Sequence, residues 1–280
     1  MHQLDISLLI AVHIATTHHQ LKLSIDSIYK QQGIPQDIII IQDGPVSLEL
    51  EIYLVDLKNN KKINQLLALK KNSGLAAALN YGLSFSRCSL IARLDPEDEV
   101  IINRFQLQME YFQNHPEIII LGGQAIEKFN NKSRLIKKPN HHSAILQYMK
   151  TRNPLIHSTV MFKKKEIDRL GGYPSIHKCQ DLYLWIKCQL NGYQFANMNK
   201  PLIQVYLNKD LIKRRDYKYF LYEKEIYQYQ YSNNLISKTH YMFITSMRFL
   251  IRSLPGFIKV FIYNLTVSYT HLRAHETSLH

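Results

Sequence analysis

Cysteine, tryptophan and long apolar runs are scarce in this chain. Its 280 residues include three cysteines and one tryptophan. Cys88, Cys179 and Cys188 are odd in number and lack the spacing of metal ligands, so we expect reduced thiols of a cytoplasmic protein. No segment reaches about 18 uninterrupted apolar residues, and a transmembrane helix is therefore not expected.

Two glycine-rich signatures of phosphate binding are also missing. The sequence contains neither a Walker A loop nor the Rossmann glycine fingerprint. The apolar run Ile6–Ala15 is short and has no basic region before it, so we expect a first strand rather than a signal peptide. With 46% hydrophobic and 20% charged residues, the chain can bury a substantial core and is not disordered. Its length suits one large domain, or one domain with an appendage.

Acidic residues are few relative to basic ones. The chain has 22 Asp and Glu against 35 Lys and Arg, which gives a net charge of +13. This excess favours anionic partners, namely nucleic acid, phosphate-bearing substrates or an anionic membrane.

Apolar runs alternate with helix-like segments through the first half of the chain, which predicts a parallel sheet with right-handed crossovers. Ligands of such sheets bind at the carboxyl ends of the strands. Here those ends fall near His13, Asp43, Asn72 and Asp95. The expected strands are Ile6–Ile14, Asp37–Gln42, Ile63–Leu69 and Leu90–Leu94, and the expected helices are Lys22–Gln31, Ser47–Leu57 and Leu75–Phe85.

The second half of the chain is less regular. We expect most of Ile212–Leu265 to be helical, basic and rich in aromatic residues. Residues 267–280 bear no relation to that pattern and resemble the translated read-through of a sequencing adapter, so they are excluded from the functional argument. The other expected elements are strands at Glu117–Glu127 and Thr159–Lys163, a helix at Asp181–Leu190 and a strand-rich segment at Gln194–Tyr206.

Three carboxylates crowd the end of the fourth expected strand. Asp95, Glu97 and Asp98 follow it directly, and Pro96 ends the strand because proline cannot donate to a sheet ladder. Like charges at this separation repel unless a cation lies between them. Mg²⁺ or Mn²⁺, held by one or two carboxylates and by substrate phosphates, fits this requirement. The alternative is a solvated acidic turn before a helix.

Two further segments follow expected strands. Asn72 and Gly74 lie in a loop that enters an alanine-rich helix, whose N-terminus can bind an anion. A simple Asn/Gly turn is the alternative. Asp43 comes directly after a buried strand and can accept hydrogen bonds from a base or a ribose, or can form an Asx-turn.

Polar residues of the second half offer further candidates. Asp181 stands at the start of an apolar helix, where it acts as a cap or as a rigidly held general base. His157 precedes a strand and either contacts substrate or is structural. Arg214 and Arg215 belong to a basic triplet that is either a solvated helix face or a pyrophosphate clamp.

Taken in order, these segments resemble the inverting GT-A glycosyltransferases of family 2, especially bacterial polysaccharide-assembly members. The resemblance runs from about Ile6 to the basic helices near Tyr263. It implies an α/β GT-A fold, Rossmann-like, with a mixed, mainly parallel sheet, flanking helices and a C-terminal helical extension. The implied division is a catalytic domain at 1–210, a basic helical extension at 211–266 and a non-native tail at 267–280.

The resemblance also implies a role for each candidate residue. Asp181 is the implied general base. Three positions depart from the family pattern: Glu97 replaces an Asp, Gln180 replaces a Glu, and His13-Ile14 replaces Tyr-Asn. The implied metal ligands for Mn²⁺ or Mg²⁺ are Asp95 and Glu97, the nucleotide-sugar contacts are Asp43, Asn72, Gly74, Arg93, Asp95, Arg214 and Arg215, and the acceptor-side or supporting residues are Asp98, His157 and Gln180.

The implied activity is metal-dependent, inverting transfer of a sugar from a nucleotide-sugar, expected to be UDP-linked, to a hydroxyl of a growing surface polysaccharide. The acceptor can be lipid-linked. Met242–Leu265 combines apolar and basic residues as helices on anionic membranes do, which places the protein in the cytoplasm at the inner membrane face. A helical cap packed on the catalytic domain is the alternative for this segment.

Three competing functions are considered. Gln180 leaves open a catalytically weak or inactive sugar-nucleotide-binding homologue. A nucleotidyltransferase normally needs a glycine- and lysine-rich loop, which is missing after Ile10. A nucleic-acid-binding function is suggested by the net charge alone. We do not expect nucleic acid as a partner, because the expected strand ends carry acidic residues.

Overall fold

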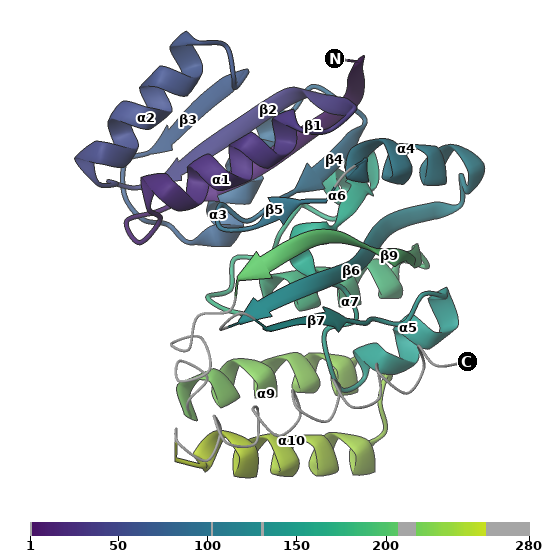
Figure 1. Ribbon diagram of the computed structural model, residues 1–280. Coiled ribbons are helices and arrows are strands. Elements are labelled where there is room, and N and C mark those ends of the chain that lie inside the picture. Colours follow the sequence, from purple (N-terminus) through teal and green to yellow (C-terminus); the bar gives the residue numbers. More distant parts are fainter. Residues whose placement is uncertain (1, 102, 130–131, 207–216, 256–280) are drawn as a thin grey trace. The chain divides into compact units, whose positions relative to one another are not determined.

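The computed structural model describes residues 2–101, 103–129, 132–206 and 217–255 (Figure 1). The chain divides into two compact units. One comprises Met1–Ala125 and Lys137–Val205, and the other comprises Ile126–Ile136 and Tyr206–His280. The domain boundaries expected from sequence remain a prediction, as does the foreign origin of residues 267–280, which lie outside the described residues.

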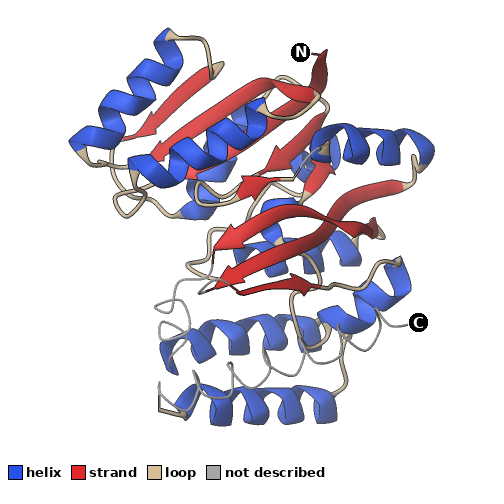
Figure 2. Ribbon diagram, viewed as in Figure 1, coloured by secondary structure: helices blue, strands red, loops and turns tan. Residues whose placement is uncertain are grey.

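A mixed sheet forms the centre of the first unit (Figure 2). Its strand order is β3-β2-β1-β4-β8-β6-β9-β5, and β7, which pairs with β6, belongs to the second unit together with the end of β6. Strands β3, β2, β1 and β4 are mutually parallel, whereas β8 runs antiparallel to both β4 and β6. The strand bounds are β1 His2–Val12, β2 Gly33–Asp43, β3 Gln65–Leu69, β4 Leu90–Arg93, β5 Glu99–Val100, β6 Ile118–Phe129, β7 Lys132–Ile136, β8 Met161–Lys163 and β9 Gln194–Tyr206.

Helices connect the strands of the first unit, as the alternating pattern predicts. The crossovers between the parallel strands are α1, α2 and α3, in chain order. The helix bounds in this unit are α1 His18–Tyr29, α2 Leu48–Asn59, α3 Leu75–Phe85, α4 Arg104–Asn114, α5 His142–Met149, α6 Lys164–Arg169 and α7 Gln180–Leu190, with a 3₁₀ turn, η1, at His157–Thr159.

The isoleucine run of β2 is buried from both sides of the sheet. Ile38 and Ile40 belong to the same apolar cluster as residues of α1 and α2. The neighbouring Ile41 faces α3, because a Cβ added to Gly82 of that helix would lie 2.7 Å from its Cδ1 atom. Helices therefore cover both faces of the strand, which explains why its sequence is continuously apolar rather than alternating.

Strand direction brings two distant segments to one edge of the sheet. The carboxyl ends of β1, β2, β3 and β4 share this edge because these strands are parallel. Ala92 of β4 is paired with Met161 of the antiparallel β8, so the residues just before β8 lie beside those just after β4. Thr159 belongs to η1 and not to the strand, which corrects the expected start of the strand at this position.

The second unit contains two helices, α9 (Tyr217–Ser232) and α10 (Lys238–Ser253), which confirms the expected helical extension within the described residues. Tyr227, Ile236 and Ile244 form its buried apolar centre. The guanidinium of Arg252 donates two hydrogen bonds to the carboxylate of Glu223, at 2.9 and 2.8 Å, and so ties α10 to α9. No helix in the described part of the chain is both long and apolar enough to cross a membrane.

Candidate active site

Asp95, just beyond β4, is held by two polar partners. It forms an ion pair with Arg93, whose side chain is almost completely buried, and it accepts a hydrogen bond from the hydroxyl of Ser158. Arg93 Nη1 also donates to Ser158 Oγ at 3.1 Å. Burial raises the pKa of Asp95, but the charge and hydrogen bond of Arg93 outweigh burial and lower it below its usual value. Asp95 is therefore an ionised carboxylate in a fixed orientation.

Glu97 and Asp98 differ in their surroundings although they are adjacent. Asp98 is 4% exposed, and burial, followed by the negative charge of Asp95, raises its pKa well above the usual range. Glu97 is exposed, and no other described residue forms a hydrogen bond or ion pair with it. The turn thus presents one open carboxylate, Glu97, beside the fixed carboxylate of Asp95, with the carboxyl of Asp98 buried behind them.

The buried side chain of Arg104 binds the backbone just before this acidic turn. It is fully buried at the start of α4 and donates to the carbonyl of Arg93 at 2.8 Å and to Gln108 Oε1 at 3.0 Å. Gln108 in turn donates to the carbonyl of Thr159 at 2.9 Å. Burial lowers the pKa of Arg104 to about 9. Through this buried chain, α4 fixes both β4 and the segment before β8, a role that sequence reasoning missed.

Asp43 holds the loop that contains the two other candidates on this edge. Its carboxylate accepts hydrogen bonds from the backbone N–H groups of Ser73, at 2.6 Å, and Gly74, at 3.0 Å. The side-chain amide of Asn72 donates to the Asp43 carbonyl at 3.3 Å. Gly74 has a φ of 88°, in the region that favours glycine, and α3 begins at the next residue. Asp43, Asn72 and Gly74 therefore form one structural group at the strand ends.

Asp181 lies in the first turn of α7 and is oriented by Asn153. Nδ2 of Asn153 donates to Oδ2 of Asp181 at 2.5 Å. Cys179, just before the helix, has a φ of 59°, and Gln180 is its first residue. A carboxylate in this position is favoured by the positive end of the helix dipole. The sequence alone assigned a role to Asp181 but none to Asn153.

His157, next to Ser158 in η1, lies among buried aromatic rings. Its Nε2 is 2.9 Å from the hydroxyl of Tyr173, and its ring meets the Trp185 indole edge-on at a centroid distance of 6.2 Å. Burial, and then the charge of Arg93, lower its pKa to about 4. His157 is therefore neutral near pH 7 and is suited to hydrogen bonding rather than to binding an anion.

The structure brings most predicted site residues to the expected edge of the sheet. Arg93, Asp95, Glu97 and Asp98 form one group with Ser158, which sequence reasoning missed. Arg214 and Arg215 lie outside the described residues. Within the described ranges, no group of three or more His, Cys, Asp or Glu side chains is arranged to hold a metal.

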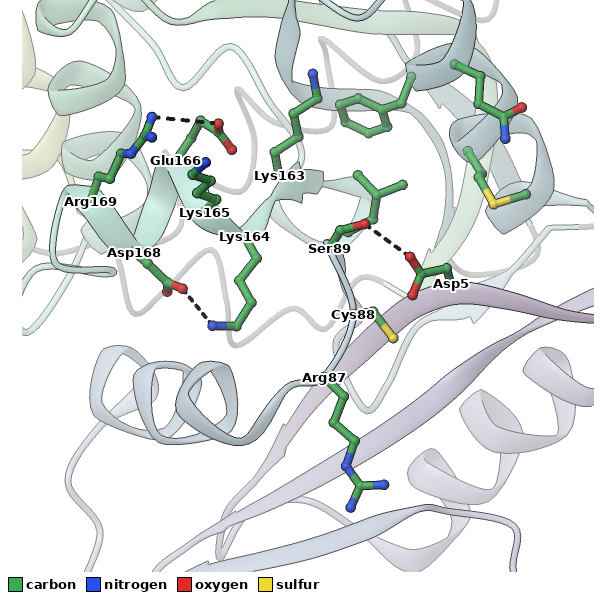
Figure 3. A pocket seen from close by; sticks show the side chains of 14 residues that line it. Asp5, Arg87, Cys88, Ser89, Lys163, Lys164, Lys165, Glu166, Asp168 and Arg169 are labelled. Atoms are coloured by element: carbon green, nitrogen blue, oxygen red, sulfur yellow. Dashed lines mark hydrogen bonds and ion pairs between the residues drawn. The ribbon is translucent and has the colours of Figure 1, made fainter.

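A hollow of about 1050 Å³ opens at the opposite end of β4 (Figure 3). Ser89 and Leu90, which begin the strand, line it, whereas Asp95 follows the strand's other end. Three of its charged groups already have protein partners, because Lys164 pairs with Asp168 and Asp5 accepts a hydrogen bond from Ser89. This hollow is therefore separate from the candidate site.

The sequence matches a family model described as "Glycosyl transferase family 2" over residues 7–171. It is 33% identical over 264 residues to a UDP-Gal:alpha-D-GlcNAc-diphosphoundecaprenol beta-1,3-galactosyltransferase of Escherichia coli, covering 93% of this chain and 96% of the relative. It is 29% identical over 262 residues to the amylovoran biosynthesis glycosyltransferase AmsE of Erwinia amylovora, covering 92% and 97% of the two chains.

Two solved structures share the fold. A Staphylococcus aureus TarS fragment, residues 1–349, in complex with UDP-GlcNAc superposes with a TM-score of 0.60 at 14% identity, covering 88% of this chain and 72% of the other. Against the longer TarS chain, the coverage is 43% of that protein. The mannosyltransferase PcManGT of Pyrobaculum calidifontis, in complex with GDP-Man and Mn2+, gives a TM-score of 0.61 at 11% identity, covering 98% and 83%.

The family match covers more than half of the chain and includes Asp43, Asn72, Gly74, Arg93, Asp95, Glu97 and Asp98. The galactosyltransferase relative extends the likeness over almost the whole length of both proteins. The solved structures agree with the α/β architecture built around a mainly parallel sheet. The chain therefore belongs to glycosyl transferase family 2 and is a glycosyltransferase with a GT-A fold.

Proposed function

We propose that this enzyme transfers a sugar from a UDP-sugar, with a divalent cation and with inversion, to a hydroxyl of a lipid-linked saccharide during polysaccharide assembly. The observation that carries the proposal is the pair of an oriented carboxylate, Asp95, and an open one, Glu97, at the carboxyl end of β4. The similar galactosyltransferase, named for UDP-Gal and a diphosphoundecaprenol-linked acceptor, supports the choice of donor and acceptor.

The residues at this edge fit a hard cation. Carboxylate oxygens are preferred by Mg²⁺ and Mn²⁺, and Asp95 and Glu97 supply them at the end of β4. Because the described residues hold no group of three ligands, Asp95 and Glu97 would share the cation with donor phosphates. The chemistry that such a cation supplies is neutralisation of the charge on the departing nucleoside diphosphate.

Asp181 is the proposed general base. Asn153 occupies its Oδ2, which leaves Oδ1 to accept the proton of the acceptor hydroxyl. The hydroxyl oxygen then forms a bond to the anomeric carbon of the donor, while the bond from that carbon to the diphosphate oxygen breaks. Attack opposite the leaving group is a single displacement and inverts the anomeric centre.

The loop around Asn72 and Gly74 is proposed to contact the nucleotide part of the donor. Asp43 shapes this loop by binding two of its backbone N–H groups. Arg214 and Arg215 remain predicted diphosphate contacts, and His157 and Gln180 remain predicted supports on the acceptor side.

The test is product formation from UDP-sugars and a short-chain diphosphate-linked saccharide, with Mn²⁺ or with EDTA. We expect metal-dependent transfer that is abolished in Asp95→Asn and Asp181→Asn but kept in Asp168→Asn, which alters an exposed acid paired with Lys164. The anomeric coupling constant of the product, measured by NMR, reports inversion. Full activity of Asp95→Asn or Asp181→Asn would remove that residue from the proposed mechanism.

The competing functions predict other results. A sugar-nucleotide-binding homologue without activity would bind UDP with Mn²⁺ but form no product. A nucleic-acid-binding protein would bind DNA with an affinity that falls steeply with salt, which a titration measures directly. We expect no such binding. The proposed location is the inner face of the cytoplasmic membrane, where a lipid-linked acceptor meets a cytoplasmic donor.

A further inference from the structure

Helix α10 leaves several large apolar side chains exposed. The exposed fractions are 57% for Met242, 68% for Phe243 and 65% for Leu250, and Phe249 is 44% exposed. Single exposed apolar residues are ordinary on protein surfaces, but a contiguous group marks an interaction site. The arrangement of these four on the helix therefore matters.

Their spacing places them on one side of the helix. Side chains three, four or seven positions apart share a helix face. Met242 and Phe249 are seven positions apart, as are Phe243 and Leu250. Ser246 lies between the two pairs, three or four positions from each of these residues. No Asp, Glu, Lys or Arg interrupts the series. We call this surface the α10 outer face; it consists of Thr239, Met242, Phe243, Ser246, Phe249, Leu250 and Ser253.

The opposite side of α10 is the one that packs within the second unit. Ile244 is 1% exposed and contributes to the apolar centre shared with α9. Arg248 and Arg252 both approach Glu223 of α9. The packing of the two helices therefore uses one side of α10 and leaves the outer face exposed, apart from Phe249 at its border, whose ring also meets Phe220 of α9 at a centroid distance of 5.5 Å.

The apolar surface continues from α10 onto the start of α9. The ring of Phe249 meets Tyr217 edge-on at a centroid distance of 6.1 Å. Tyr217 is itself 51% exposed, and Leu221, one turn along α9, is also exposed. Aromatic side chains with a polar tip, such as tyrosine, are favoured where an apolar phase meets water.

Two partners could cover this surface, a second copy of the chain or a lipid membrane, and the net charge of the protein favours the membrane. A second copy of the chain would bring together two proteins that each carry a net charge of +13, which opposes association. An anionic lipid surface is attracted by the same charge. We propose that the α10 outer face inserts into the headgroup region of an anionic membrane, with α10 lying in the plane of the surface.

This inference deepens the proposed function, because a lipid-linked acceptor would be met at such a surface. Vesicle binding tests it without any enzyme reaction. The full-length protein is floated with vesicles of phosphatidylcholine alone or mixed with phosphatidylglycerol. We expect wild type to float only with the mixed vesicles, and we expect the double variant Phe243→Ser/Leu250→Ser to bind them at least about tenfold more weakly.

A matched control carries the same change on α2. Leu48 and Ile52 are 72% and 61% exposed there, so Leu48→Ser/Ile52→Ser removes comparable apolar surface elsewhere. We expect this variant to bind as wild type does. A second measurement uses Phe243→Trp, whose indole fluorescence should shift to shorter wavelength on adding mixed vesicles, against the constant signal of the buried Trp185.

Three results would overturn the inference. They are equal flotation of wild type and the α10 double variant, an indole that does not respond to vesicles, and a wild-type dimer in light scattering that the double variant converts to monomers. The proposed function fails separately, through loss of sugar transfer to a short-chain acceptor in solution. That reaction should be unchanged by Phe243→Ser/Leu250→Ser.

Discussion

The side-chain amide of Asn153 donates a 2.5 Å hydrogen bond to one carboxylate oxygen of Asp181. The two residues are 28 positions apart, and Asn153 lies in a segment without regular structure whereas Asp181 starts α7. The bond fixes which oxygen of the proposed base remains available to an acceptor.

Replacing Asn153 should therefore slow the chemical step. We expect Asn153→Ala to lower kcat by about 10- to 100-fold while leaving the KM for the donor unchanged, because Asp181 loses its orientation but the donor contacts remain. Steady-state kinetics at saturating acceptor measure both constants. Asn191→Ala, at the other end of α7, is the control, and a donor KM that rises in proportion would contradict the assignment.

Removing the buried guanidinium of Arg104 should destabilise the protein. Arg104→Met leaves the Arg93 carbonyl and Gln108 without their donor, so we expect a loss of about 2–4 kcal/mol in the free energy of unfolding. Urea denaturation measures the loss. The exposed Arg169→Met should change stability by less than about 0.5 kcal/mol, and equal stability of the two variants would refute the role given to Arg104.

Asp43→Ala should loosen the loop at Asn72. The backbone N–H groups of Ser73 and Gly74 lose a charged acceptor, and we expect the donor KM to rise by about tenfold or more. Asp43→Asn keeps one acceptor oxygen, so its donor KM should lie between those of wild type and Asp43→Ala. The exposed Asp56→Ala serves as control, and an unchanged donor KM in Asp43→Ala would show that the loop does not contact the nucleotide.

His157 should make stability depend on pH. Its pKa is lowered from 6.5 to about 4, so the unfolded chain binds the proton first as the pH falls. The free energy of unfolding should decrease by at most about 3 kcal/mol as the pH falls from about 6.5 to about 4. Below about pH 4, protonation of His157 should cause no further decrease. Urea unfolding across this range compares wild type with His157→Gln, which should be less sensitive, and with the exposed His19→Gln, which should not differ from wild type.

Metal removal should weaken nucleotide binding. We expect UDP to raise the melting temperature strongly with Mn²⁺ and only slightly with EDTA, because the cation would be shared by Asp95, Glu97 and the phosphates. Glu97→Gln should need about tenfold more Mn²⁺ for the same shift. Glu51→Gln, on the exposed side of α2, is the control, and identical Mn²⁺ titrations of both variants would exclude Glu97 as a ligand.

The four parallel strands were predictable because their apolar runs are continuous and each ends at a polar loop. Helix α4 was not predicted, although Phe105, Met109 and Phe112 follow a helical spacing toward the core. Arg104 and Gln108 lie four residues apart on its buried side, where the helical period leads one to expect apolar residues. Their hydrogen bonds to β4 and to the segment before β8 could therefore not be foreseen from the pattern. The two-residue strand β5 is too short to carry any period.

Candidate residues that follow strands lie at the expected edge of the sheet, and their roles remain predictions, whereas their hydrogen-bond partners were not foreseen. Asp95 can be recognised in the sequence because it follows an apolar run. Ser158, 63 residues later, lies next to it only because β8 pairs antiparallel with β4. Sequence periodicity indicates that a strand exists and not which neighbour it pairs with. The contact of Asn153 with Asp181, 28 positions later, was likewise not foreseen.

The position of β8 in the sheet also affects how the chain can fold while it is being synthesised. A chain that has emerged only as far as η1 can pair β3, β2, β1 and β4, but β4 then forms an open edge of the sheet. Unpaired edges recruit other strands and promote aggregation. Synthesis of Met161–Lys163 closes this edge and at the same time brings Ser158 to Asp95, so the step that protects the nascent protein is also the one that fixes the orientation of the Asp95 carboxylate.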